Sequence, residues 1–192
     1  MKYYIEITVL PSADIGHHFL WEKIFQQVHL GLVEMKDSNG TVPIGISLPE
    51  YNKERHELGS KLRLFAASKL LLETLNAPKW LGRFMDYVHL TRVRPVPDHV
   101  SAYACYSRQQ PKSSIERLAR RKAKRERIEI HKALELLEGY QEQLLKNPFI
   151  TMTSQSSGKR FRLFILKEDA DQPMDQGFSS YGLSRRSTVP EF

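Results

Sequence analysis

The order of strand-like and helical segments in the first 97 residues most limits the fold of this chain. Residues 3–10 alternate and are rich in β-formers, which predicts a strand that ends at Pro11. Helical spacing follows in an apolar stripe at Trp21, Ile24, Phe25, Val28 and Leu32. The other elements expected here are strands at 42–48, 61–66 and 87–94 and helices at 68–75 and 80–85. This β-α-β-β-α-β order is that of a ferredoxin-like domain.

After Pro97 the pattern changes, so we predict an α+β fold of two parts: a ferredoxin-like domain at residues 1–97 and a divergent α+β domain at 98–192. A strand is expected at 100–106. Ser113 and Glu116 have capping-box spacing, which predicts the start of an arginine-rich helix. Helical character then continues, and its apolar positions are Ile130, Ala133, Leu134, Leu137 and Leu144.

The net charge of +7 is concentrated in one segment. Residues 108–132 contain ten Lys and Arg against three Glu, an excess equal to that of the whole chain. On a helix, Arg117, Arg120, Arg121 and Lys124 fall on one face with Arg125 beside it. Cations stacked in this way repel one another unless an anion neutralises them, so the pattern favours a polyanionic partner. The alternative is a solvated helix face.

The segment from Phe149 to Leu166 reads FITMTSQSSGKRFRLFIL and predicts a β-hairpin with a Ser/Gly turn at 154–158. Short hydroxyls and a glycine allow close approach to a phosphate, and the following strand interleaves cations with Phe161. This combination suits a nucleic-acid surface, although a solvated hairpin would have the same composition. Residues 167–176 are expected to form an acidic loop, and the last few residues a loose tail.

Several protein classes are disfavoured by the composition. The single cysteine, Cys105, excludes internal disulfides and multi-cysteine metal sites, and it is expected to pack within a strand. The sequence has neither an apolar run long enough to span a membrane nor a signal peptide at its start. We therefore expect a cytoplasmic protein without a membrane partner, a metal site or a cofactor.

Several segments occur in a specific order and spacing: FQQVHLGLV around His29, IGISLP, SRQQ followed by ERLARR, SQSSGKRFRLFI, and the ending GFSSYGLSRRSTVPEF. Nearly end to end, the chain thereby resembles the CRISPR repeat endoribonucleases of type I-F systems, Csy-type members of the CRISPR RNA-processing endonuclease superfamily. The resemblance implies an enzyme that binds the hairpin of a CRISPR repeat transcript and cuts at its 3′ base. It further implies that the enzyme stays on the mature crRNA with the other subunits of the surveillance complex.

The resemblance also implies roles for single residues. His29 matches the catalytic histidine, Ser154 the active-site serine and Tyr181 a tyrosine near the active site. Arg108 and Gln110 match residues that read purine edges in the stem. The remaining residues expected to bind RNA are Arg117, Arg120, Arg121, Lys124 and Arg125 of the basic helix, Ser156 of the turn, and Phe161, which matches a stacking aromatic. The chain departs from the family pattern in two ways. It has lysines at positions 122 and 124, and its helical character continues where the family usually has a Ser/Glu-rich break.

The chemistry follows from these residue types. RNA cleaves itself when a base removes the proton of a 2′-hydroxyl that is aligned with the neighbouring phosphate, and this step requires no metal. An imidazole with a pKa near ~6.5 suits that task at neutral pH. His29 would be the base, Ser154 would hold the 2′-oxygen, and Tyr181 would orient His29. The products would be a 2′,3′-cyclic phosphate and a 5′-hydroxyl.

Other readings of the same residues remain open. His29 could fill a surface or core position, the serines could serve only to form the turn, and Tyr181 could be a core aromatic. His17 and His18, which lack partners at metal-ligand spacing, are expected to be exposed. At the level of the protein, the alternatives are a non-catalytic subunit that caps the guide hairpin and a basic ribosome- or transfer-RNA-associated protein.

Overall fold

The computed structural model describes residues 1–100, 102–110, 115–139 and 145–192. Contacts divide the chain into two compact units. The first unit joins Met1–Gln109 to Asn147–Phe192, and the second unit is Gln110–Lys146.

The first sheet contains the strands expected in the first half of the chain. They are β1 (Tyr3–Val9), β2 (Ile44–Ser47), β3 (Lys61–Ala66), β4 (Val88–Leu90) and the short β5 (Arg94–Pro95). The strand order is β2-β3-β1-β4, with β5 also paired to β1, and all these pairs are antiparallel. Ile5, Ile7 and Val9 alternate along β1 and are buried, as a half-buried strand requires.

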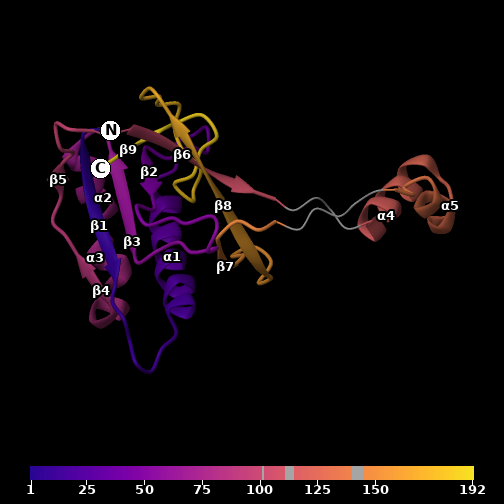
Figure 1. Cartoon of the computed structure of the whole chain (residues 1–192), viewed down its shortest axis with the longest axis horizontal. Helices are drawn as coiled ribbons and strands as arrows, with labels where there is room; N and C mark the ends of the chain where they lie inside the picture. The colour runs from indigo at the N-terminus through magenta and orange to yellow at the C-terminus, as the bar shows by residue number, and fades with distance from the viewer. Residues whose placement is uncertain (101, 111–114, 140–144) are drawn as a thin grey trace. The chain divides into compact units, whose positions relative to one another are not determined.

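The helices of the first unit pack on this sheet or on one another. They are α1 (His17–Glu34), α2 (Lys69–Leu75), α3 (Ala77–Leu81) and the 3₁₀ turn η1 (Gly82–Tyr87). The apolar stripe predicted for α1 is fully buried, each residue being at most 3 % exposed. α1 packs against β1 and α3 and also against β7 (Phe149–Thr153) of the second sheet (Figure 1). This one helix therefore contacts both sheets.

The second sheet has the order β7-β8-β6-β9. Its other strands are β6 (Ala102–Gln109), β8 (Arg160–Ala170) and β9 (Val189–Glu191). The predicted hairpin is present as β7 and β8. The strand expected at 100–106 runs on to Gln109, because the long β8 provides pairing partners for Ser107, Arg108 and Gln109. Arg108 is therefore a strand residue.

Two sequence expectations for the end of the chain were wrong. β8 continues to Ala170, so part of the segment expected as an acidic loop is a strand. The last residues are not a loose tail, since β9 pairs with β6 and both Val189 and Pro190 are buried. Such a short strand has little periodicity of its own and depends on tertiary pairing.

Both sheets share one hydrophobic core, which includes Ile7 and Leu64 from the first and Ala104 and Ile165 from the second. A hydrogen bond also joins β6 to the residue that follows β2, since the Tyr106 hydroxyl donates to the Leu48 carbonyl at 3.1 Å. The α+β class with antiparallel sheets is confirmed. The predicted division at residue 97 falls between the two sheets but cuts through this core, and the assignment of two domains stays a prediction.

The second unit contains α4 (Ile115–Glu126) and α5 (Ile130–Glu135), packed through Ala119, Ala123 and Ala133. The helical character expected to continue past the basic helix is interrupted: α5 is helical as expected, but a break separates it from α4. Arg127 adopts a left-handed conformation, with φ of 54°, and the Ile128 N–H donates to the Ala123 carbonyl at 3.1 Å. This closure ends α4 as a Schellman motif does. The expected cap at Ser113 and the apolar Leu144 lie outside the described residues.

Gly182 allows the loop around Tyr181 to pack closely against β2. Gly182 has φ of +70°, and a Cβ added there would meet the side chain of Ile46 in β2. We expect Gly182→Ala to lower the free energy of unfolding by about 2–4 kcal/mol, from left-handed strain and from overpacking against Ile46. Gly158→Ala is the control, because Gly158 has φ of +65° but open space around it. Urea denaturation would measure both, and equal losses would contradict the role of the Ile46 contact.

Candidate active site

His29 lies on α1, buried at its contact with the loop that contains Tyr181. The imidazole stacks on the Tyr181 ring, with centroids 4.2 Å apart and an interplanar angle of 8°. Its Nδ1 lies 2.7 Å from the Ser180 carbonyl oxygen. Since a carbonyl only accepts, Nδ1 carries the hydrogen, and in the neutral ring Nε2 has the free lone pair. Nε2 is thus the ring nitrogen that is able to accept a proton.

The surroundings of His29 favour its neutral form. Burial lowers the pKa of His29 below the ordinary value of 6.5, and the positive charge of Lys36 lowers it further. The hydrogen bond to the Ser180 carbonyl acts in the opposite direction and raises this pKa, but burial dominates. At neutral pH the imidazole is therefore able to accept a proton.

The loop that contacts His29 is held by backbone hydrogen bonds and by two buried apolar side chains. The Ile46 N–H of β2 donates to the Gly182 carbonyl at 3.0 Å, and the Gly182 N–H donates to the Ser179 carbonyl at 2.8 Å. Phe178 and Leu183, on either side of this turn, are both 3 % exposed. Ser180 and Tyr181 are therefore presented to α1 from a well-anchored turn.

Arg108 connects Tyr181 to Phe161. Its guanidinium carbon lies 5.2 Å from the Phe161 ring centroid and 5.8 Å from the Tyr181 ring centroid. Among the residues that the structure describes, its buried Nε has no hydrogen-bond partner. A cavity of about 310 Å³ opens beside it, lined also by Ser184 and Arg185. The structure thus brings together His29, Tyr181, Arg108 and Phe161, and adds Arg185, for which the sequence analysis assigned no role.

Ser154 begins the turn between β7 and β8, and its hydroxyl belongs to a small cluster. The Ser157 hydroxyl donates to Ser154 Oγ at 3.0 Å, and Ser156 Oγ lies 3.2 Å from Ser154 Oγ. Backbone bonds close the turn, since the Gly158 N–H donates to the Ser154 carbonyl at 2.8 Å. β7 packs on α1, so the strand that leads into Ser154 contacts the helix that contains His29.

The remaining predicted RNA-binding residues belong to the second unit. Gln110, which follows β6, is exposed. The predicted basic side chains of α4 are also exposed: Arg117, Arg120, Arg121, Lys124 and Arg125. Arg125 donates to Glu126 Oε1 at 2.9 Å, and Lys122 Nζ lies 3.3 Å from the same oxygen. Arg125 and Lys122 therefore share the Glu126 carboxylate.

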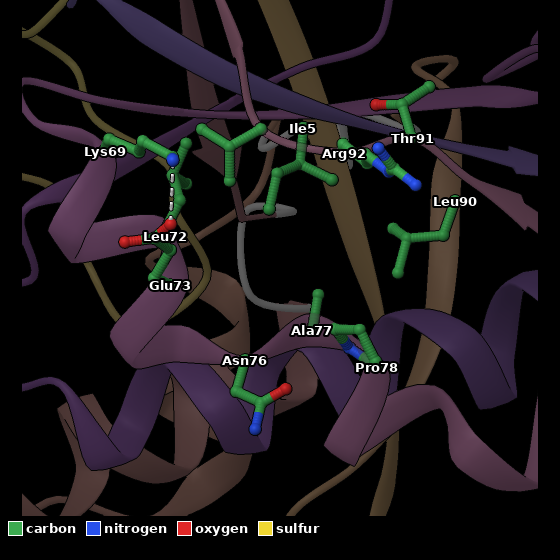
Figure 2. Close-up of a pocket in the computed structure, with 11 residues that line it drawn as sticks. Ile5, Lys69, Leu72, Glu73, Asn76, Ala77, Pro78, Leu90, Thr91 and Arg92 are labelled. Atoms are coloured by element: carbon green, nitrogen blue, oxygen red, sulfur yellow. Dashed lines mark ion pairs between the residues drawn. The ribbon is translucent and has the colours of Figure 1, made fainter.

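A larger cavity, of about 550 Å³, contains none of the predicted site residues (Figure 2). It lies between the first sheet and helices α2 and α3, with Ile5 and Leu72 among its lining residues. Lys69 and Glu73 form an ion pair of 3.2 Å at one side. Arg108 and Tyr181 line the smaller cavity instead.

The residues that the structure describes contain neither a candidate metal cluster nor a membrane-spanning helix. They contain no group of three or more His, Cys, Asp or Glu that could hold a metal ion. The helices in the same ranges include none with the length and apolar character needed to cross a bilayer. His17 and His18 are exposed as expected, although His18 Nε2 lies 3.3 Å from the Thr151 hydroxyl.

Residues 4–192 match the profile of a family described as CRISPR-associated protein (Cas_Csy4). The chain belongs to this family. Two proteins named CRISPR-associated endonuclease Cas6/Csy4 are similar over the full length of both chains: one from Escherichia coli (strain UTI89 / UPEC), 35% identical over 193 residues, and one from Pseudomonas aeruginosa (strain UCBPP-PA14), 33% identical. These matches confirm the family predicted from the sequence and support its enzymatic class.

A solved structure titled "An RAMP protein binding different RNA substrates" aligns with a TM-score of 0.38 and 9% identity, covering 98% of this chain and 99% of that one. At this level of similarity it adds nothing to the assignment of the Cas_Csy4 family.

The electrostatic surroundings of His29 can be tested directly. Titration by NMR should place the pKa of His29 below 6.5, because burial disfavours the charged ring. Lys36→Gln should raise this pKa, since removal of a positive charge makes protonation easier. Lys53→Gln, an exposed lysine elsewhere, is the control and should leave it unchanged. A His29 pKa above 6.5 in the wild type would contradict the neutral-base assignment.

Proposed function

We propose that this Cas_Csy4 family member is a metal-independent endoribonuclease that processes CRISPR repeat transcripts in the cytoplasm. It binds the repeat stem-loop, cuts at the 3′ base of the hairpin, and stays on the mature crRNA within the type I-F surveillance complex. The observation that best supports this proposal is the state of His29. Its Nδ1 is engaged by the Ser180 carbonyl and its ring lies on Tyr181, which leaves Nε2 as the proton acceptor.

In the proposed reaction, His29 Nε2 removes the proton of the 2′-hydroxyl next to the scissile phosphate. The 2′-oxygen then attacks phosphorus, the bond to the 5′-oxygen breaks, and the departing oxygen takes up a proton. The products are a 2′,3′-cyclic phosphate and a 5′-hydroxyl. Ser154 positions the nucleophilic oxygen by a hydrogen bond, and Tyr181 keeps the imidazole in its plane.

Stem recognition is assigned to other residues. Arg108 makes a bidentate contact to guanine O6 and N7, and Gln110 makes a similar pair of bonds to adenine. The exposed cations of α4 neutralise phosphates along the groove, with Ser156 assisting at the turn and Phe161 stacking near the scissile end. In this proposal residues 1–97 form the ferredoxin-like domain that contains His29, and residues 98–192 form the RNA-recognition domain.

The nucleophile can be removed from the RNA itself. A single 2′-deoxy nucleotide immediately 5′ of the scissile phosphate should abolish cleavage while binding persists, because the 2′-oxygen is the attacking group. EDTA should leave cleavage of the all-RNA hairpin unchanged. His29→Ala should likewise abolish cleavage and leave affinity within a few-fold. Gel-shift and single-turnover assays on the same preparations would measure both properties.

Each alternative predicts a different result in these assays. A nuclease that uses water as its nucleophile would cut the deoxy hairpin. A nuclease that depends on a metal ion would fail in EDTA. A non-catalytic cap would bind the all-RNA hairpin without cutting it. Near wild-type cleavage by His29→Ala would reject His29 as the base.

Base readout and phosphate contact can be separated by their salt dependence. Arg108→Ala and Gln110→Ala should each relax selectivity at one stem base pair, at a cost of about 1–3 kcal/mol in discrimination. Lys124→Ala should instead weaken all stems alike and reduce the salt slope by about one. Affinities for a panel of stems at several salt concentrations would show the difference. Equal loss across every stem for Arg108→Ala would identify it as a phosphate contact.

A further inference from the structure

Glu22, Gln26 and His29 lie on the same flank of α1. Gln26 is four residues after Glu22, and His29 is three residues after Gln26. Glu22 and Gln26 both bond to the β7–β8 hairpin. The Thr153 N–H donates to Gln26 Oε1 at 3.0 Å, and Arg160 Nη2 donates to Glu22 Oε2 at 2.5 Å. Thr153 and Arg160 face each other in the last registered pair of β7 and β8, directly before the turn. Helix α1 therefore holds both ends of the turn that begins with Ser154.

The Gln26–Thr153 bond is the closer of the two to the proposed chemistry. Ser154 follows Thr153 in the chain, and His29 lies one helical turn beyond Gln26. The Thr153 N–H can only donate, so the amide oxygen of Gln26 has to face it. Among the described residues, the other end of this amide, Nε2, is buried without a hydrogen-bond partner. Its orientation thus follows from the bond to Thr153.

We propose that Gln26 is a positioning residue for cleavage. By accepting the Thr153 N–H it sets the place of Ser154 relative to His29, so that the 2′-oxygen held by the serine lies within reach of the imidazole. This inference rests on the proposed function. Its main effect falls on the cleavage step, because stem binding is assigned chiefly to Arg108, Gln110 and α4 and only in part to Ser156 of this turn.

Two substitutions remove this bond from opposite sides. Gln26→Leu removes the acceptor, and Thr153→Pro removes the donor at the end of a strand whose described neighbour in the sheet is β8 alone, where proline is tolerated. Each should slow single-turnover cleavage about ten- to a hundredfold while hairpin affinity and melting temperature change little. Gln27→Leu, one residue along the same helix and about 100° around it, is the matched control and should cut near the wild-type rate.

A double-mutant cycle then separates positioning from general destabilisation. If Gln26 acts through Ser154, Gln26→Leu should slow the wild type but add little to Ser154→Ala. The inference would be overturned if the losses in cleavage rate multiplied in the double variant. It would also be overturned if Gln26→Leu and Thr153→Pro both cut at the wild-type rate while Ser154→Ala was slow. Absence of cleavage by the wild type would instead reject the proposed function, and this inference with it.

Discussion

The packing of α1 against both sheets is the constraint on which the candidate site depends. Its apolar stripe, buried from Trp21 to Leu32, contributes roughly 1.5–3 kcal/mol for each large side chain removed from water. With that stripe committed to the core, the adjoining flank of the helix is directed at the β7–β8 hairpin and at the loop of Tyr181. His29 occupies this flank. A local change in the site is therefore coupled to the main core of the first unit.

Two opposite electrostatic conditions coexist in this chain. His29 is buried, and burial lowers the pKa of its imidazole below the ordinary value, which favours the neutral ring. The cations of α4 are exposed, where they remain charged and hydrated until a polyanion replaces the water. The separation into two units provides each condition in its own segment.

The sequence and the structure agree most closely where periodicity is strong. The α1 stripe, the strand at 61–66 and the hairpin around the serine turn were each predicted from local spacing and are present. Agreement is weakest where a tertiary partner decides the result. β9 forms because β6 offers it an edge, and β6 itself extends through Arg108 because β8 is long enough to pair with it. The end of α4 at Glu126 was missed because Arg127, the left-handed residue that follows it, is not a glycine.

By itself, the sequence determined the α+β class, the order of elements in the first half, the concentration of charge on one helix, and the family. These properties follow from local composition, from spacing and from the order of motifs. Only the tertiary structure decided that Tyr181 stacks on His29, that the Ser180 carbonyl selects its tautomer, and that Gln26 bonds to Thr153. These residues are separated by more than a hundred positions, so no local pattern encodes their contacts. They meet because the chain buries one face of α1 and thereby brings the flank beside it against the β7–β8 hairpin and the loop of Tyr181.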